Sequence, residues 1–338
     1  MTQELKLAKL MRTFRAHPSS DAPSNPILES WSDAVQDAGW TYLTTGRPDV
    51  LLVHWPFASL QDRNRVTAIA KSSARLLAYL SLRLRGTRLV YVVHNMIPHD
   101  STMAWFSGLM MRAFYRLCSG FIFLSNASLV EFTQGFSVGG KPSTVTGHGP
   151  YNVDPVAQRP EHKTFTLGFF GRLEPYKGID RILPILQTPS ASNWNLKVWG
   201  AASRSDYIKK LDGLCSDRVD LRVGWIEDSD LIRLAAEVDL FVFPFRTITN
   251  SGSVVMALCL GRPVAVTSTP AMLEMQQRVG SDWLYLLQED DLETSLKDAA
   301  AWVATIPRGV ADLRSRLVSW ADVGAQTVNV FRRVIHGD

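Results

Sequence analysis

The sequence has few cysteines and no long apolar run. Its three cysteines, Cys118, Cys215 and Cys259, lie far apart among 338 residues, without the close spacing of a metal site. This odd number predicts reduced thiols and a cytoplasmic protein. No uninterrupted stretch of about 18 apolar residues is present, which argues against a transmembrane helix. The first residues lack the basic, apolar and small-residue order of a signal peptide, so none is expected.

Composition and length narrow the class of protein. Apolar residues make up 46% of the chain and charged residues 20%, the balance of a globular protein with a sizeable core. A length of 338 residues exceeds one ordinary domain and suits two. No Gly-x-Gly-x-x-Gly motif opens the chain, so a dinucleotide-dependent oxidoreductase is the least favoured enzyme class.

The net charge of +4 is unevenly distributed. Residues 1–150 carry 15 basic and 9 acidic side chains, whereas residues 151–338 carry 21 and 23. Between Arg63 and Arg88 there are seven basic residues and no acidic one. A basic half predicts an anionic partner, and composition alone leaves nucleic acid, a membrane surface and a phosphorylated substrate open.

Strand-like and helix-like segments alternate along both halves of the chain. Apolar segments predict strands at 50–55, 89–94, 120–125, 143–146, 165–170, 196–199, 219–223, 240–243 and 264–266. A helix is expected from Pro26 to about Ala38. Apolar residues at helical spacing between Val66 and Leu84 predict another helix, whose apolar stripe is expected to pack on the core. Such alternation predicts an α/β fold with parallel, doubly wound sheets.

Two domains of this kind are expected. Residues 1–155 form the first and residues 163–316 the second, joined by a polar, proline-bearing linker at 151–163. The amphipathic tail at 317–338 is expected to be helical and to pack back on the first domain. A ligand is expected in a central cleft between the domains, beyond the carboxyl ends of the strands.

The segment 171–180, Gly-Arg-Leu-Glu-Pro-Tyr-Lys-Gly-Ile-Asp, carries the first chemical motif. It follows the predicted strand 165–170 and precedes a helix predicted at 179–186. Its first glycine permits a sharp turn, and Arg172 and Lys177 place two cations that suit a diphosphate. The alternative is a surface loop whose cations are solvated.

A second motif lies at 243–253, between a predicted strand and an apolar helix at 254–260. Backbone N–H groups of Ser251, Gly252 and Ser253 would face an anion at the N-terminus of that helix. The simpler interpretation is that a serine or asparagine here only caps the helix. Two phosphate-type motifs on one face of one domain support each other.

Together these residues resemble the donor domain of GT-B glycosyltransferases, and the resemblance covers most of the chain. Four segments are similar in particular to xanthan-type GDP-mannose:glycolipid 4-beta-mannosyltransferases. They are Val53-His54-Trp55-Pro56, Val93-His94-Asn95-Met96-Ile97-Pro98-His99-Asp100, Arg172–Gly178, and Asn250-Ser251-Gly252 with the following helix. The resemblance implies a GT-B fold with two Rossmann-like domains, a nucleotide-sugar substrate, GDP-mannose in particular, and no cofactor.

The sequence departs from the pattern of retaining GT-B enzymes, many of which carry two glutamates around this loop and helix. The matching positions here are Ile248 and Met256, and neither side chain accepts a hydrogen bond from a sugar hydroxyl. The departure matches the mannosyltransferase resemblance, which implies inversion. Contacts to the donor sugar are then expected from Thr249 and Asn250. The two cations and the backbone N–H groups would hold the leaving diphosphate, so no metal is expected.

An inverting reaction needs a general base for the acceptor hydroxyl, and the strand ends of the first domain offer candidates. Asp100 is the first choice, with His99 as its neighbour or substitute. His94 is expected to bind the donor sugar or its phosphate, as the resemblance implies. For each histidine the alternative is an ordinary polar contact or loop cap.

Further residues are expected to face the cleft. His54 and Trp55 end a predicted strand, and His148 lies between two glycines after the last strand of the first domain. Core packing is the simpler interpretation of Trp55 and Trp105, and stacking on an acceptor sugar is the alternative. Trp225 and Ile226 follow a strand where similar enzymes hold the nucleobase through backbone contacts, and guanine is implied by the resemblance.

The basic surface of the first domain suits a lipid-linked acceptor. Basic residues flank the apolar stripe between Arg65 and Arg85, and the segment Trp105–Cys118 adds aromatics, methionines and two arginines. Basic residues beside exposed aromatics suit an anionic membrane, and the alternative is core packing beneath solvated arginines. No nucleic-acid reader motif is present, so nucleic acid is not an expected partner. We expect a peripheral protein on the inner face of the plasma membrane.

The favoured function is an inverting transferase that moves mannose from GDP-mannose to a polyprenyl-diphosphate-linked oligosaccharide in bacterial exopolysaccharide biosynthesis. A retaining transferase of the same fold with another donor is the second hypothesis. A sugar-nucleotide 2-epimerase is the third.

Overall fold

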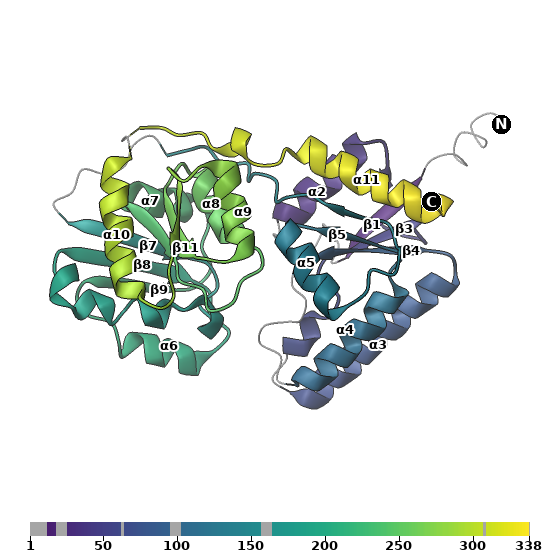
Figure 1. Cartoon of the computed structure of the whole chain (residues 1–338). Helices are drawn as coiled ribbons and strands as arrows, with labels where there is room; N and C mark the ends of the chain where they lie inside the picture. The colour runs from purple at the N-terminus through teal and green to yellow at the C-terminus, as the bar shows by residue number, and fades with distance from the viewer. Residues whose placement is uncertain are drawn as a thin grey trace. The chain divides into compact units, whose positions relative to one another are not determined.

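The computed structural model describes residues 12–17, 26–61, 64–94, 103–156, 164–306 and 309–337. The chain divides into two compact units, of which unit 1 comprises Met1–Gly149 with Val318–Asp338 and unit 2 comprises Pro150–Leu317. Each unit has its own six-stranded sheet, covered by helices (Figure 1). All strand pairs of both sheets are parallel, which confirms the predicted α/β class.

The sheet of unit 1 has the strand order β2-β1-β3-β4-β5-β6. Its strands are β1 (Thr13–His17), β2 (Thr41–Tyr42), β3 (Val50–Val53), β4 (Arg88–Val93), β5 (Gly120–Phe123) and β6 (Ser143–Val145). The four strands predicted for this half are present, and β1 and β2 are additional. Only two residues of β1 are apolar and β2 is two residues long, so neither has the continuous apolar run that marks a buried strand.

Side chains from the two faces of this sheet enter separate cores. Val50, Leu52 and Val90 pack with helices α2 (Pro26–Asp37) and α11 (Trp320–His336). Leu51 and Tyr91 point the other way, toward helices α3 (Arg65–Leu84), α4 (Ala104–Leu117) and α5 (Asn126–Gly135). Helix α11 lies beside α2 in Figure 1, so the end of the chain completes the core of unit 1.

Helix α3 contradicts the predicted burial of its apolar stripe. The stripe residues Val66, Ile69, Leu77, Leu80 and Leu84 are all exposed. The residues that α3 buries are Ala68, Ser72 and Tyr79, and the Tyr79 ring lies 5.1 Å from the Phe114 ring of α4. Helical spacing shows that a helix is amphipathic, but the packing of Tyr79 on α4 decides which face meets the core.

Helix α4 also differs from the sequence expectation. Its aromatics and methionines Met110, Met111, Phe114 and Tyr115 are buried, so they do not form an exposed surface. Trp105, for which core packing was the simpler interpretation, is 73% exposed. The first turn of α4 is therefore amphipathic, with Trp105 exposed to solvent and Phe106 buried.

The sheet of unit 2 has the strand order β12-β11-β10-β7-β8-β9. Its strands are β7 (Phe165–Phe170), β8 (Trp194–Gly200), β9 (Val219–Val223), β10 (Leu240–Phe243), β11 (Val264–Thr267) and β12 (Leu284–Leu287). Five were predicted, and β12 is additional. The order reverses between β7 and β10, and this switch point is where doubly wound sheets bind ligands.

The helices of unit 2 connect these strands. They are α6 (Ser205–Asp212), α7 (Asp228–Glu237), α8 (Gly252–Cys259), α9 (Pro270–Val279) and α10 (Leu292–Thr305). The helix predicted at 179–186 is not an α-helix. Short 3₁₀ turns occupy this region, η3 at Ile179–Arg181 and η4 at Ile185–Gln187. Pro184 has no backbone N–H to continue a helix, which explains the break.

The boundary between the units lies before the predicted linker. The backbone N–H of Tyr151 donates to Cys259 Sγ at 3.3 Å, and that of Val156 donates to the Leu260 carbonyl at 3.0 Å. Residues 150–156 therefore pack on the end of α8 in unit 2 instead of forming a free linker. The remainder of the predicted linker, 157–163, lies outside the described residues.

Candidate functional site

The two predicted motifs of unit 2 lie together at the switch point of its sheet. Gly171 ends β7 with a φ of 121°, and a Cβ atom there would lie 2.9 Å from Ser253 Oγ. Gly178 has a φ of 72°, and a Cβ atom there would lie 2.0 Å from the Pro244 carbonyl oxygen. Both glycines thus allow the loop after β7 to approach closely, at Gly171 to the first turn of α8 and at Gly178 to the loop after β10. The sharp turn expected at Gly171 is present.

Replacing Gly178 by alanine should destabilise unit 2. The side chain would combine a left-handed backbone with a clash against a carbonyl, and we expect a loss of about 2 kcal/mol in the free energy of unfolding. Gly213 is a matched control, because a Cβ atom there meets nothing closer than 3.5 Å and its φ is −66°. Urea denaturation measures both variants, and equal stability of the two would contradict the close approach.

Arg172 and Lys177 lie in different environments within the same loop. The Arg172 side chain is 58% exposed, with Nη2 at 3.5 Å from Glu174 Oε1. The Lys177 Nζ lies 4.4 Å from the centre of the Phe245 ring and 5.1 Å from that of the Tyr176 ring. Burial, with a smaller contribution from Arg172, lowers the pKa of Lys177 to about 8. A cation held among rings favours a bound anion that restores its lost solvation.

The N-terminus of α8 borders the same loop. Ser251 is the N-cap, and its Oγ accepts a hydrogen bond from the Val254 N–H at 3.4 Å. The capping interpretation is therefore correct for this side chain. The first N–H groups of a helix have no acceptor within the helix, and the Gly171 turn lies close to Ser253 in this first turn. Asn250 Nδ2 is buried and has no partner among the described residues.

Glu174 is a buried carboxylate of this loop that sequence reasoning did not single out. It is 1% exposed, and its Oε1 accepts hydrogen bonds from the Ser203 N–H at 3.2 Å and from the Ser203 hydroxyl. Its Oε2 is buried without a partner among the described residues. The sequence signal was an acidic residue between the two cations of the motif. Ser203 follows β8, so its contact with Glu174 can be found only from the tertiary structure.

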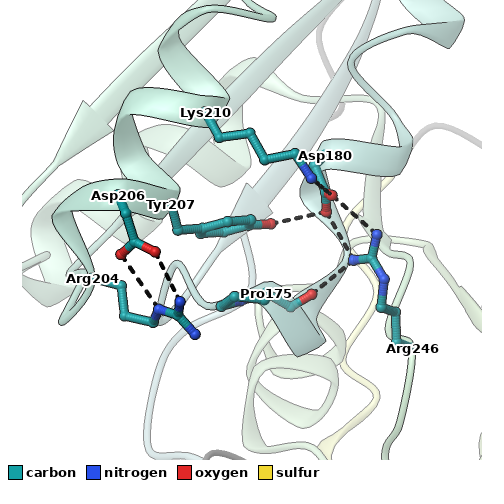
Figure 2. A pocket seen from close by; sticks show the side chains of 7 residues that line it. All are labelled: Pro175, Asp180, Arg204, Asp206, Tyr207, Lys210 and Arg246. Carbon is teal, nitrogen blue, oxygen red and sulfur yellow. Dashed lines mark hydrogen bonds and ion pairs between the residues drawn. The ribbon is translucent and has the colours of Figure 1, made fainter. Parts of the chain in front are cut away.

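A pocket of about 360 Å³ lies beside this loop, between the segments that follow β7, β8 and β10 (Figure 2). Its lining residues are Pro175, Asp180, Arg204, Asp206, Tyr207, Lys210 and Arg246. Asp180 accepts from Tyr207 Oη at 3.0 Å, from Lys210 Nζ at 2.6 Å and from Arg246 at 2.8 and 3.0 Å. Burial acts to raise the pKa of Asp180, but hydrogen bonds from Arg246 and Lys210 outweigh it and hold the pKa at about 2.

Asp180→Ala should destabilise unit 2 by about 2 kcal/mol, because a buried carboxylate with three partners is removed. The value is below that of a fully buried ion pair, since the Lys210 and Arg246 side chains are 57% and 42% exposed. Asp206→Ala is the control, because its pair with Arg204 lies on the surface. A thermal melt with equal midpoints for the two variants would refute the structural role of Asp180.

The remaining donor-domain predictions fall at the same edge of the sheet. Trp225 follows β9 and is 65% exposed, with Ile226 next to it. Thr249 is buried, 8% exposed, just before the cap of α8. The single Asp-x-Asp triplet of the sequence, 228–230, forms the first turn of α7, where Asp230 pairs with Arg233 at 2.8 Å.

Unit 1 brings together three of the predicted cleft residues. His54 follows β3 and His94 follows β4, and His54 Nδ1 lies 3.0 Å from His94 Nε2. The Trp55 ring stacks on the His94 ring with centroids 4.5 Å apart. The adjacent ends of two paired strands position this cluster. The histidines make the polar contact that was their simpler interpretation, whereas Trp55 is half-buried against His94 and does not belong to the core.

Burial keeps the histidines of this cluster neutral. It lowers the pKa of His94 to about 3, with a further effect of His148, and it lowers that of His54 well below its usual range. His148 follows β6, and its Nδ1–H donates to the Gly149 carbonyl at 2.6 Å. Burial lowers the pKa of His148 to about 4. Neutral imidazoles at neutral pH offer N–H donors and lone pairs, but no positive charge.

His17 is a further histidine at this edge that sequence reasoning missed. It ends β1, and its carbonyl accepts the His54 N–H at 2.8 Å. The order of this sheet reverses between β1 and β3, so His17 and His54 occupy its switch point. The sequence signal is weak, because only two residues of β1 are apolar. His99 and Asp100, the predicted bases, lie outside the described residues.

Comparison with known proteins gives a consistent picture. Residues 164–305 match the family described as glycosyl transferases group 1. The chain is 27% identical over 316 residues to the GDP-mannose:glycolipid 4-beta-D-mannosyltransferase of Xanthomonas campestris pathovar campestris. That alignment covers 90% of this chain and 87% of the relative.

Solved structures are similar over nearly the whole chain. The sucrose-phosphate synthase of Thermosynechococcus elongatus has a TM-score of 0.69 at 14% identity, covering 97% of this chain and 100% of that one. Anabaena HepE in complex with UDP-glucose has a TM-score of 0.59 at 15% identity, covering 97% and 99%. At these identities the similarity concerns the fold.

Proposed function

We propose that this chain, in which residues 164–305 form a group 1 glycosyltransferase domain within a GT-B fold, is an inverting mannosyltransferase. Its donor would be GDP-mannose and its acceptor a polyprenyl-diphosphate-linked oligosaccharide of exopolysaccharide biosynthesis. The observation that carries the proposal is the match over 90% of the chain to a GDP-mannose:glycolipid 4-beta-D-mannosyltransferase. The product would contain a beta-mannosidic bond.

The loops at the switch point of unit 2 suit the donor diphosphate. Arg172 offers a planar fork, Lys177 a desolvated point charge, and the N-terminus of α8 a set of N–H groups beside the Gly171 turn. Asn250 Nδ2, buried without a partner among the described residues, would donate to a donor-sugar or phosphate oxygen. Thr249 would contact the donor sugar, and the backbone around Trp225 and Ile226 would bind guanine.

The reaction needs no charge on the histidines of unit 1. An acceptor hydroxyl attacks the anomeric carbon, its proton passes to the Asp100 carboxylate, and the bond from that carbon to the diphosphate oxygen breaks to release GDP. Neutral His94, fixed by His54 and stacked on Trp55, would hydrogen-bond the donor. His99 would orient or replace Asp100. Arg172, Lys177 and α8 would stabilise the leaving diphosphate without a metal.

GDP affinity should depend on the protonation of Lys177. The free-protein pKa of about 8 means that Lys177 is charged below pH 8, and a bound diphosphate favours the charged form. The affinity for GDP should therefore be nearly constant well below pH 8, and at pH 9 it should be lower by up to about tenfold. Lys177→Arg stays charged and should remove this dependence. Titration calorimetry between pH 7 and 9 measures the GDP affinity of wild type and of Lys177→Arg. The same pH dependence in both proteins would contradict a contact between Lys177 and the diphosphate.

Product analysis tests the whole proposal. Purified protein with GDP-mannose and a short-chain polyprenyl-diphosphate oligosaccharide should release GDP, and EDTA should leave the rate unchanged. The anomeric configuration of the product, read by NMR, separates inversion from retention. Absence of GDP release, together with GDP binding no tighter than that of other nucleotides, would refute the mannosyltransferase assignment. Deuterium exchange into the donor without acceptor would favour an epimerase instead.

A lipid-linked acceptor places the substrate at a membrane. None of the described helices combines the length and apolarity needed to cross a bilayer. The excess of basic residues in the first 150 positions suits the anionic inner face of the plasma membrane. We therefore propose peripheral attachment of unit 1 to that surface.

A further inference from the structure

Helix α3 carries a stripe of large apolar side chains on its exposed face. Val66, Leu77 and Leu84 are 76%, 64% and 79% exposed, and Ile69 and Leu80 lie on the same face. The spacings of three, eight, three and four residues place all five in one line along the 20-residue helix. At a rise of 1.5 Å per residue, the line is about 30 Å long. Isolated exposed leucines are ordinary, but five large apolar side chains on the exposed face of one helix mark an interaction surface.

The neighbouring helix α4 adds to the exposed apolar surface of this pair. Its first turns expose Trp105 by 73% and Leu109 by 55%, while Phe106 and Met110 between them are buried. The two helices are held together through Tyr79 and Phe114, and they lie side by side in Figure 1. A rigidly packed helix pair thus presents apolar side chains outward.

The charges of this helix pair have one sign. Basic residues on or next to the two helices are Arg65, Lys71, Arg75, Arg83, Arg85, Arg112 and Arg116. No acidic residue occurs between Asn64 and His94, nor between Met103 and Val130. A second copy of the same face would bring like charges together, which opposes self-association. An anionic lipid surface instead complements both the apolar line and its basic surroundings.

We infer that the exposed face of α3, with Trp105 and Leu109 of α4, inserts into an anionic bilayer. The helix would lie in the plane of the interface, with its leucines about 5–10 Å deep and its arginines at the phosphate level. This inference rests on the proposed function, because a lipid-linked acceptor is the reason for unit 1 to bind a membrane, and it names the surface that binds. Attachment would occur by hydrophobic insertion, and not by charge attraction alone.

Vesicle co-sedimentation of the full chain tests this face without donor or acceptor. The vesicles contain phosphatidylcholine with about a third phosphatidylglycerol, and pure phosphatidylcholine vesicles are the comparison. The double variant Leu77→Gln/Leu84→Gln should reduce the bound-to-free ratio on anionic vesicles at least about tenfold. Val130→Gln is the matched control, because Val130 is 55% exposed on α5 of the same unit. This variant should bind anionic vesicles within about twofold of wild type.

The outcomes separate the inference from the proposed function. The inference would be overturned if the wild-type protein bound neither vesicle type. It would also be overturned if the double variant bound anionic vesicles as well as wild type does. Light scattering that shows a dimer lost in the double variant would assign the face to a second copy and overturn it too. GDP affinity is measured on the same proteins and should be unchanged, since α3 belongs to unit 1. If the wild-type protein does not bind GDP, the proposed donor site is refuted instead.

Discussion

Replacing both Arg172 and Lys177 by alanine should weaken GDP binding about 100-fold or more. Hydrogen bonds to charged groups contribute about 1.5–3 kcal/mol each, and the lower end applies because the Arg172 side chain is 58% exposed. Lys177 loses a desolvated charge beside Phe245 that only a bound anion compensates. Titration calorimetry of GDP with wild type and with each single variant gives the separate contributions.

The control for this double variant removes a lysine of the same unit away from the loop. Lys297 pairs with Glu293 at 2.9 Å on α10, so Lys297→Ala should leave GDP affinity within about twofold of wild type. Unchanged GDP affinity in the double variant would move the diphosphate away from the switch point of unit 2. A parallel loss in the control would point to general charge attraction rather than direct contacts.

Asp100→Asn should lower turnover about 100-fold or more while GDP affinity stays within about twofold of wild type. The amide cannot accept the proton of the acceptor hydroxyl, and general-base catalysis typically contributes at least that factor. The measurement is kcat with saturating GDP-mannose, beside calorimetry with GDP. Asp33→Asn, an exposed position on α2 of the same unit, is the matched control.

Retention of the wild-type rate in Asp100→Asn would transfer the role of base to another group. His99 is the next candidate, because it precedes Asp100 in the sequence. His94 is a weaker one, since its ring is already bonded to His54 and stacked on Trp55. A loss of GDP affinity equal to the loss of rate would indicate a structural role instead.

Several positions of the candidate site follow directly from the sequence. The strand before Gly171, the two cations and the small polar residues before α8 are local patterns, because each depends on a few adjacent residues. The agreement of predicted and observed bounds for β7 and β10, which lie in the middle of their sheet, has the same origin. Central parallel strands are apolar on both faces and stand out in the sequence.

Other parts of the site depend on residues far apart in the chain. The Ser203 contacts of Glu174 and the Arg246 contacts of Asp180 join different strand-end loops, so no sequence spacing encodes them. The same applies to His17, which reaches His54 only because β1 pairs with β3. Parallel pairing places the carboxyl ends of neighbouring strands together, and which strands are neighbours is a property of the topology.

The sequence by itself determined the α/β class, the position of the strand-end motifs and the amphipathic nature of α3. The tertiary structure decided which face of α3 is buried, because Tyr79 of α3 packs against Phe114 of α4 and turns the leucine line outward. The 3₁₀ turns at 179–187, in contrast, have a local cause, because Pro184 lacks the N–H that would continue a helix. Periodicity and composition are local quantities, whereas burial is set by the partners that the whole fold supplies.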